Sequence, residues 1–365
     1  MNTIKDNFPP YDKIAHFMVA VISIVFVLYI GSSIILPILF SLLFAILLNP
    51  IVNFLHRKKL PRVLAITIVI IVAVLFISSL VFFLITQLSL LSNMLPQLKL
   101  QLNTISQQTI YWISDEFNIS VGKLEVLLNN ALNDGISNTS LLIGETLLGI
   151  SGALIIIFLV PVYVFMILFY KPLIMEFIRK VSASEKNHNT QEILQNSKSL
   201  VQSYLIGLLI EFTIVSTLNT VGLLIIGVRF AVLLGIIGGL LNIIPYVGGI
   251  IAVVITMVFA LTTLSASATI WVVVVYILVQ FIDNNIIMPY VVASKVKINA
   301  LTSIIVVLVG NAVWGVPGMF LSIPLTAIIK VIFDRIDPLK PYGFLLGDTM
   351  TRQPNAIIKK LNPFK

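Results

Sequence analysis

The sequence predicts an all-α fold, a polytopic membrane protein of about eight helical membrane segments, and two observations lead to this class. First, 58% of the 365 residues are hydrophobic and only 10% are charged, whereas soluble domains carry about 25% charged residues. Second, five stretches lack Asp, Glu, Lys and Arg, and each exceeds the roughly 20 apolar residues that span a bilayer. Backbone amides in lipid must bond within their own segment, so these spans are helices. The five stretches are residues 14–55, 63–98, 146–170, 230–282 and 298–329.

The N-terminal part, residues 1–87, is predicted to form a membrane hairpin and a third span. Residues 14–30 and 33–51 make the two arms of the hairpin. The loop that follows, residues 56–62, holds four positive charges and no acid, which is typical of a cytoplasmic loop. It therefore places the N-terminus in the cytoplasm and directs the third span, residues 63–87, outward.

Residues 88–146 differ in kind, because they hold two Lys against five Asp or Glu, a net charge of −3. Apolar residues recur at helical spacing in the first third of this segment. We expect an extramembrane amphipathic helical insert on the outer side, packed on itself or on a neighbouring subunit. Residues 147–199 then hold a fourth span, to residue 170, and a loop whose positive excess suits the cytoplasm.

The predicted transport core, residues 200–333, is interrupted twice by Gly and Pro. A span at 200–226 contains Glu211, and a span at 269–290 contains Asp283. Two pairs of short apolar halves accompany them. The first pair is 230–244 and 248–264, and the second is 300–314 and 319–332.

Two topologies are open for these short halves. If each pair makes one broken span, Lys295 and Lys297 lie outside. If each pair folds back as a re-entrant hairpin, both lysines lie inside, together with the basic tail at residues 334–365. The tendency of positive charge to stay in the cytoplasm favours the re-entrant hairpins. In either case, irregular backbone at membrane depth requires cover by protein or a water-filled cavity.

Glu211 and Asp283 are the charged residues of most interest, because a charge in the hydrocarbon costs about 2.5–3.5 kcal/mol on insertion scales. Glu211 is either a proton- or cation-linked group or a structural carboxyl bonded to a neighbouring helix. Pairing of Glu211 with Arg229 is disfavoured, since the two residues are 18 positions apart and that length of helix covers about 27 Å. Asp283, Asn284 and Asn285 are predicted to form a polar turn. Asp283 is either a helix cap or interfacial loop acid, or part of a polar cluster that contacts the hairpin tips and lines a pathway. Carboxylate and amide oxygens of this kind suit a hard monovalent cation such as Na⁺.

The glycines around Asn242 either allow close helix packing or form an irregular tip with free backbone groups. The predicted substrate or ion pathway consists of Glu211, Asn242, Pro245, Tyr246, Gly248, Gly249, Asp283, Asn284, Asn285, Pro289, Gly315, Pro317 and Gly318.

Several function classes lack their parts in this sequence. Cysteine is absent, which excludes disulfides and thiolate metal sites. No His-Glu-x-x-His, paired Gly-x-Ser-x-Gly or Walker A motif occurs, so we expect neither an enzyme nor direct use of ATP. We expect no cofactor and no metal centre. The net charge of +8 lies in loops beside the helices and reports topology, so no nucleic-acid partner is expected.

The C-terminal third resembles the AI-2E transporter family, the PerM-type permeases. Three blocks carry the resemblance in order, and the N-terminal hairpin and outer insert agree with it. The blocks are Gly-Gly-Leu-Leu-Asn-Ile-Ile-Pro-Tyr-Val-Gly-Gly at 238–249, Asp-Asn-Asn-Ile-Ile-Met-Pro at 283–289, and Gly-Val-Pro-Gly-Met at 315–319. The position of Glu211 matches no motif of the family, and its role is inferred from its place in a span.

This resemblance implies a homo-oligomer in the bacterial inner membrane with both termini in the cytoplasm. It also implies export of a small solute such as autoinducer-2, by secondary or facilitated transport. A Na⁺(Li⁺)/H⁺ antiporter is the alternative, favoured by the two intramembrane carboxyls. A non-transporting membrane scaffold is a second alternative.

Overall fold

The computed structural model describes residues 10–92, 95–117, 120–122, 126, 150–182, 189–244, 247–293, 296 and 298–348. Within these ranges every regular element is a helix, apart from one isolated bridge between Ile298 and Gly347, which confirms the all-α prediction. The chain divides into two compact units. The first unit contains residues 1–39, 173–205 and 292–365, and the second contains 40–172 and 206–291.

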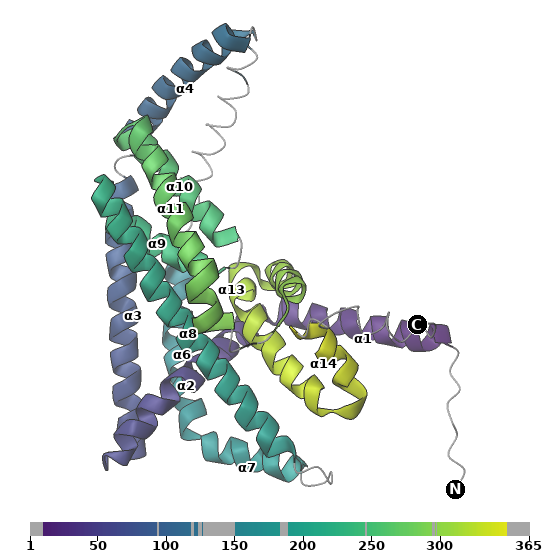
Figure 1. The fold of residues 1–365 in the computed structure, drawn as a ribbon. Coiled ribbons are helices and arrows are strands. Elements are labelled where there is room, and N and C mark those ends of the chain that lie inside the picture. Colours follow the sequence, from purple (N-terminus) through teal and green to yellow (C-terminus); the bar gives the residue numbers. More distant parts are fainter. Residues whose placement is uncertain are drawn as a thin grey trace, which may run out of the picture. The chain divides into compact units, whose positions relative to one another are not determined.

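One part of the second unit packs α3 (Arg62–Ser92) against α6 (Ile150–Phe169) and the end of α2 (Ser32–Arg57) (Figure 1). Buried Ala, Ile, Val and Leu side chains join these three helices. Polar side chains hold the helix ends: Arg62 donates to the carbonyl of Leu168 at 2.7 Å. The predicted spans therefore correspond to helices. In the predicted insert, α4 (Leu95–Phe117) is helical as expected, whereas residues 127–149 lie outside the described residues.

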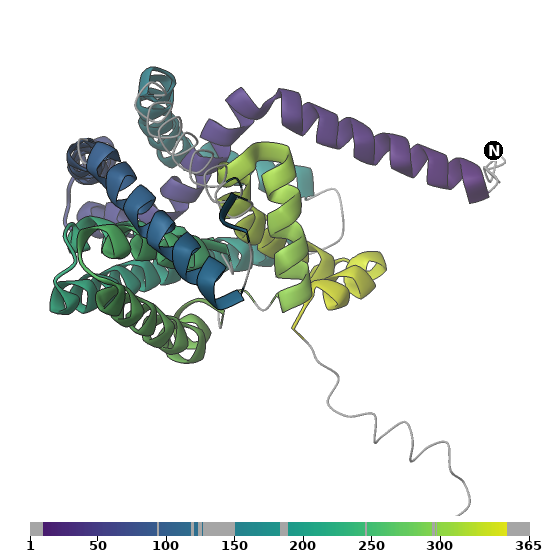
Figure 2. The same cartoon turned by 90° about the horizontal axis from the view of Figure 1, so that it is seen from above.

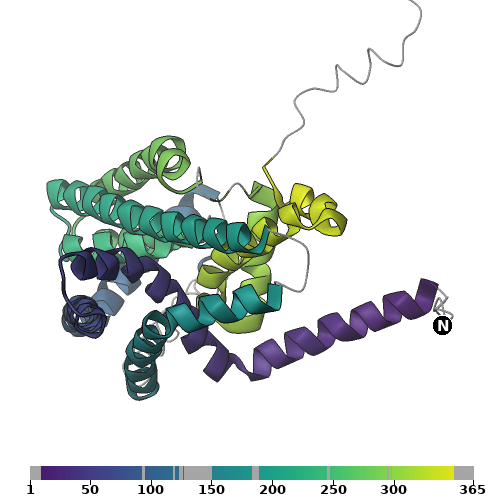
Figure 3. The ribbon, with the colours of Figure 1, turned by 90° about the horizontal axis from the view of Figure 1, so that it is seen from below.

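Four helices of the predicted transport core lie side by side (Figures 1 and 2). Long α8 (Asn189–Ile226) runs without a break, as Figure 3 shows, and begins in the first unit but ends in the second. Then follow α9 (Ala231–Asn242), α10 (Val247–Thr263) and α11 (Ala266–Ile282). The predicted short halves at 230–244 and 248–264 are thus α9 and α10, and they pack together as a helical hairpin.

One prediction for this region is wrong: residues 283–285 do not form a polar turn. The chain continues from α11 directly into a π-helix, η1 (Asp283–Ala293). The π-helix has a wider turn than an α-helix and forms i→i+5 hydrogen bonds. Pro289 lies inside it and lacks a backbone N–H, so a regular α-helical ladder is interrupted there in any case.

In the first unit, α13 (Ala300–Arg335) contains the second predicted interruption. Gly315 has φ 63° and ψ −144°, a backbone conformation that only glycine adopts readily, and it divides α13 into two halves. The halves fold back on each other and approach closely. A Cβ built on Gly310 would overlap the carbonyl oxygen of Gly318. Figure 2 shows this fold as an arch in yellow-green.

Side-chain hydrogen bonds hold the other elements of this unit to α13. The indole of Trp314 donates to the carbonyl of Leu28 on α1 (Pro10–Ile30) at 2.8 Å. Asn299 caps α13 by accepting from the amide of Thr302. Its Nδ2 also donates at 2.7 Å to the carbonyl of Leu345 on α14 (Lys340–Leu346). The bond from Asn299 thus holds α14, which lies in the segment predicted as a cytoplasmic tail, to the start of α13.

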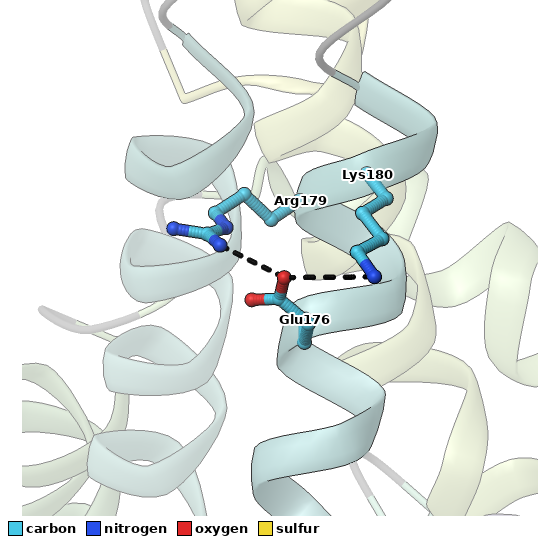
Figure 4. Close-up of polar contacts among 3 residues, drawn as sticks. All are labelled: Glu176, Arg179 and Lys180. Atoms are coloured by element: carbon cyan, nitrogen blue, oxygen red, sulfur yellow. Dashed lines mark hydrogen bonds and ion pairs between the residues drawn. The ribbon is translucent and has the colours of Figure 1, made fainter.

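The predicted loop at 171–198 is a second correction, since it contains α7 (Lys171–Ser182) and the first turns of α8. Glu176 pairs with Arg179 at 2.8 Å and lies 4.0 Å from Lys180 (Figure 4). Apolar side chains such as Phe177 occupy another face of α7. A twelve-residue amphipathic helix is too short and too charged to register as a span, which explains the error. Such exposed ion pairs contribute little stability.

Five described helices are long and apolar enough to cross a membrane, or six if α6 and α7 form one broken span. The chain is therefore a polytopic helical membrane protein. The shorter apolar helices include parts of α1, α9 and α10. The prediction of about eight segments with re-entrant hairpins stays a prediction.

Candidate functional site

The candidate site is a buried cluster of three polar side chains, called here the carboxyl cluster: Glu211, Asn242 and Asp283. Each comes from a different element of the second unit, namely α8, α9 and the junction of α11 with η1. Glu211 is 3% exposed and Asp283 is 2% exposed. Folding therefore removes both carboxyl groups from the surface, at a cost that membrane proteins rarely accept without a role.

Asn242 joins the two carboxyls through a single amide nitrogen. Its Nδ2 donates to Glu211 Oε1 at 3.1 Å and to Asp283 Oδ2 at 2.9 Å. Asn242 is the last residue of α9, so this nitrogen lies at the tip of the α9–α10 hairpin. The contact that was predicted between the Asp283 region and a hairpin tip is therefore present.

Among the described residues, no positive charge pairs with the cluster. Between residues 206 and 283 the sequence holds one basic residue, Arg229. Its guanidinium lies over the ring of Phe230, 5.5 Å from the ring centre. None of the ion pairs among the described residues involves Glu211 or Asp283. The pairing with Arg229 is thus absent, and the hydrogen-bonded alternative for Glu211 is what the structure has.

Glycines let the hairpin tip approach the cluster closely. A Cβ on Gly248 would overlap the carbonyl of Leu241, so only glycine fits where α10 begins. A Cβ on Gly249 would meet Gln280 Oε1 and lie 3.8 Å from Asn242 Oδ1. Both glycines were predicted as site residues, and the structure places both beside Asn242.

The remaining predicted residues have other positions. Asn284 follows Asp283 directly and accepts from Gln280 Nε2 at 3.2 Å, and Asn285 donates to the carbonyl of Phe281. Pro289 lies further along η1. Two further residues, Pro245 and Tyr246, fall outside the described residues. The last three, Gly315, Pro317 and Gly318, belong to the bend of α13 in the first unit, whereas the cluster belongs to the second.

Sequence reasoning missed four polar residues near the cluster: Ser216, Asn219, Thr256 and Tyr276. All are buried on α8, α10 and α11, and the Thr256 and Tyr276 hydroxyls lie 2.9 Å apart. Neutral polar side chains are common in membrane helices and leave little trace in a sequence. The available signal was Asn219, the one side-chain amide in residues 206–226.

Chemically, the carboxyl cluster can hold protons or bind a small cation, because it presents four carboxyl oxygens and one amide in a protein-enclosed setting. Two carboxylates that share a site disfavour full ionisation of both. Carboxylate and amide oxygens are also ligands for hard cations. Within the described residues, no three His, Asp or Glu side chains are grouped to hold a metal ion.

Comparison with known proteins agrees with this picture. Residues 18–337 match the family described as AI-2E family transporter. YueF of Bacillus subtilis (strain 168) is 26% identical over 320 residues, which cover 85% of this chain and 86% of YueF. YhhT of Escherichia coli (strain K12) is 25% identical over 343 residues, 93% of this chain and 96% of YhhT. The AI-2 transport protein TqsA of the same strain is 25% identical over 319 residues, which cover 87% of this chain and 90% of TqsA.

Proposed function

The chain belongs to the AI-2E transporter family, and on this premise we propose that it is a secondary transporter of a small solute, driven by charge changes at the carboxyl cluster. It works in the bacterial cytoplasmic membrane with both termini in the cytoplasm. Autoinducer-2 is the first solute to test, because TqsA is named for it. The comparisons and the membrane helices support transport; the coupling rests on the cluster.

The observation that carries the coupling is the Asn242 bridge. Two buried carboxyls, without a basic partner among the residues that the structure describes, meet one amide on a hairpin tip. A carrier of a neutral solute needs no such pair. A carrier that binds and releases a proton or cation needs a site whose charge changes, and a carboxyl pair provides one.

A Na⁺(Li⁺)/H⁺ antiporter is the second candidate, favoured by the same oxygens. In that case Asn242 turns its amide by half a revolution when the cation enters, so that Oδ1 faces the ion instead of Nδ2. The carboxyls then alternate between proton and cation. A third possibility is a membrane scaffold, in which the outer insert binds a partner and the cluster only joins helices.

The deciding experiment measures transport in proteoliposomes. Solute uptake and proton movement are followed for the intact chain, Glu211→Gln and Asp283→Asn, with Glu176→Gln as the control carboxyl, exposed on α7. We expect each cluster variant to slow proton-coupled flux at least about tenfold, since each substitution removes one of the two intramembrane carboxyls that bind and release the proton. The control should match the intact chain.

The outcomes separate the candidates. The antiporter is supported if the cluster variants lose cation-dependent proton movement and the intact chain transports no autoinducer-2. If neither cluster variant changes proton movement, both coupled mechanisms are wrong. Deleting residues 103–133 tests the scaffold, which should lose its partner, whereas a transporter keeps its flux.

We also propose that the protein works as a homo-oligomer, as its family resemblance implies. Exposed aromatic side chains on α4, among them Trp112 at 62% exposure, offer a surface for a second copy. Native mass spectrometry of the intact chain and of Trp112→Ser measures the subunit number. A monomer in both would contradict this proposal.

A further inference from the structure

Helix α7 begins two positions after the uncharged, apolar helix α6 ends, so it starts where a membrane helix reaches the bilayer surface. Two hydrogen bonds show which end of the membrane helices this is. Arg62, the last residue of the basic loop, donates to the carbonyl of Leu168 at 2.7 Å. Lys171 Nζ donates to Asn49 Oδ1 on α2 at 2.9 Å. The start of α7 is therefore held at the surface where the basic loop, residues 56–62, lies.

Apolar side chains line one face of α7. Leu173, Ile174 and Phe177 are 64%, 41% and 65% exposed, and half-buried Ile178 continues the same face at helical spacing. Exposed apolar patches of this kind mark sites of contact with a membrane or another protein. Because the helix starts at the bilayer surface, the nearest apolar partner for this face is the lipid itself.

Positive charge lies on the rest of the helix. Arg179 is about 160° around the helix axis from Phe177, and Lys180 is about 60° from it, at the edge of the apolar face. Their side chains are 74% and 76% exposed. Figure 4 shows that they share one acid, Glu176. With Lys171, α7 holds three basic residues and one acid, a net charge of +2.

The basic loop makes the same end of the second unit positive. Arg57, Lys58 and Lys59 are exposed, and none of the ion pairs among the described residues involves them. Anionic lipid headgroups attract basic side chains beside a membrane helix. A leaflet that contains anionic lipid offers a negative surface above an apolar layer, and these two layers match the two faces of α7.

We propose that α7 is an interfacial helix that binds anionic phospholipids. Its apolar face enters the boundary between headgroups and acyl chains, as amphipathic helices with a basic polar face do. Arg179 contacts lipid phosphate directly, whereas Lys180 extends its chain along the apolar edge to reach the same level. The predicted orientation assigns this surface to the cytoplasmic leaflet. The inference concerns neither the solute nor the carboxyl cluster.

Spin labels test the depth of α7, and no native cysteine interferes. Phe177→Cys and Arg179→Cys are labelled separately in the full-length protein in nanodiscs, and collision with oxygen or with a water-soluble nickel chelate is measured. We expect the label at 177 to meet oxygen more often and the label at 179 to meet nickel more often. If nickel reaches both labels equally, α7 lies in water and the proposal is wrong. If neither reagent reaches the label at 177, a protein surface covers this face, which also overturns the proposal.

Lipid binding is tested by native mass spectrometry of the full-length protein titrated with phosphatidylglycerol or phosphatidylcholine. Arg179→Gln should lower the affinity for phosphatidylglycerol about fivefold and leave phosphatidylcholine unaffected. Lys340→Gln is the matched control, because Lys340 is also exposed and pairs with an acid three positions earlier, Asp337. Equal losses in both variants, or no loss in either, would show that α7 has no lipid site of its own.

Lipid binding and proton coupling can fail independently. Glu211→Gln should retain phosphatidylglycerol as the intact chain does, even where it loses proton movement. A loss of lipid selectivity in Glu211→Gln equal to that in Arg179→Gln would contradict the assignment of the lipid site to α7.

Discussion

Asn242 shows at the scale of a single residue how the site depends on one side chain. It supplies both amide hydrogens to carboxyl groups, so no other donor is needed to hold the three elements together at this point. A hydrogen bond to a charged partner contributes more than a neutral one, and an unpaired buried carboxyl costs still more.

Replacing this amide should therefore destabilise the protein. Asn242→Leu removes both bonds, and we expect a loss of about 1.5–3 kcal/mol in the free energy of unfolding. Thermal unfolding in nanodiscs provides the measurement, with Asn285→Leu as control because exposed Asn285 donates to the backbone of its own helix, at the carbonyl of Phe281. In a Glu211→Leu/Asp283→Leu background, the same substitution should cost less than half as much. An equal cost in both backgrounds would show that Asn242 acts by packing alone.

The sequence identified these residues only in part. Glu211 and Asp283 stand out because each is a charge within or at the edge of a long uncharged run. Asn242 was predicted from the Gly and Pro residues around it. The bridge itself could not be predicted, since it depends on how α9 approaches α8 and α11, and residue spacing does not determine that approach.

At the scale of elements, glycines determine how closely α8 and α9 pack. A Cβ on Gly235 would meet the backbone of Thr220, with its nitrogen 2.7 Å and its Cα 2.9 Å away. Backbone atoms cannot move aside as a flexible side chain does. Small residues at such contacts are the usual means of close helix association in lipid.

Gly235→Ala should separate these two helices. We expect a loss of about 1–3 kcal/mol from overpacking, and a lower transport rate as the cluster is displaced. Gly122→Ala is the control, because no atom lies within 4 Å of the added methyl group. Unfolding temperature and proteoliposome flux should change together in the first variant and stay unchanged in the second.

The bend of α13 leads to another prediction at this scale. Gly315→Ala places a side chain at φ 63° and ψ −144°, and we expect a cost of about 1–3 kcal/mol. The bend should open, and distances between spin labels on its two halves should increase or broaden. An unchanged distance distribution at unchanged stability would contradict this account.

Elements were predictable where local chemistry interrupts them. Gly227 and Gly315 both have positive φ, and each directly follows the predicted end of a membrane segment, at residues 226 and 314. The π-helix at Asp283 was not predicted, because an Asp-Asn-Asn run is typical of a turn and the wide helical turn depends on packing against neighbouring helices. Likewise α7 was missed because its charges hid a short amphipathic helix among loop residues.

At the scale of the whole molecule, run lengths of uncharged sequence predict a helical membrane protein, and the structure confirms this class. The number and sidedness of the segments do not follow as directly. Short helices such as α9 can belong to a broken span or to a re-entrant hairpin, and their length and composition suit both.

Topology can be tested by cysteine labelling, because the native chain has no cysteine. Val296, between the two predicted hairpins, is buried, so exposed Ala300 at the start of α13 is the better position. Re-entrant hairpins predict that Ala300→Cys reacts only from the cytoplasm, like Lys58→Cys in the basic loop. Thr104→Cys on α4 should react from outside. External labelling of Ala300→Cys in intact cells would favour single broken spans.

The Asn242 bridge also has a consequence for the movement of the hairpin. Two separate bonds hold the tip of α9, one to each carboxyl, and breaking either leaves the other in place. Release of the tip therefore requires two coincident events, one at Glu211 and one at Asp283. The hairpin tip is then released only when both events coincide, so single substitutions would reveal the loss of one carboxyl but not this joint requirement.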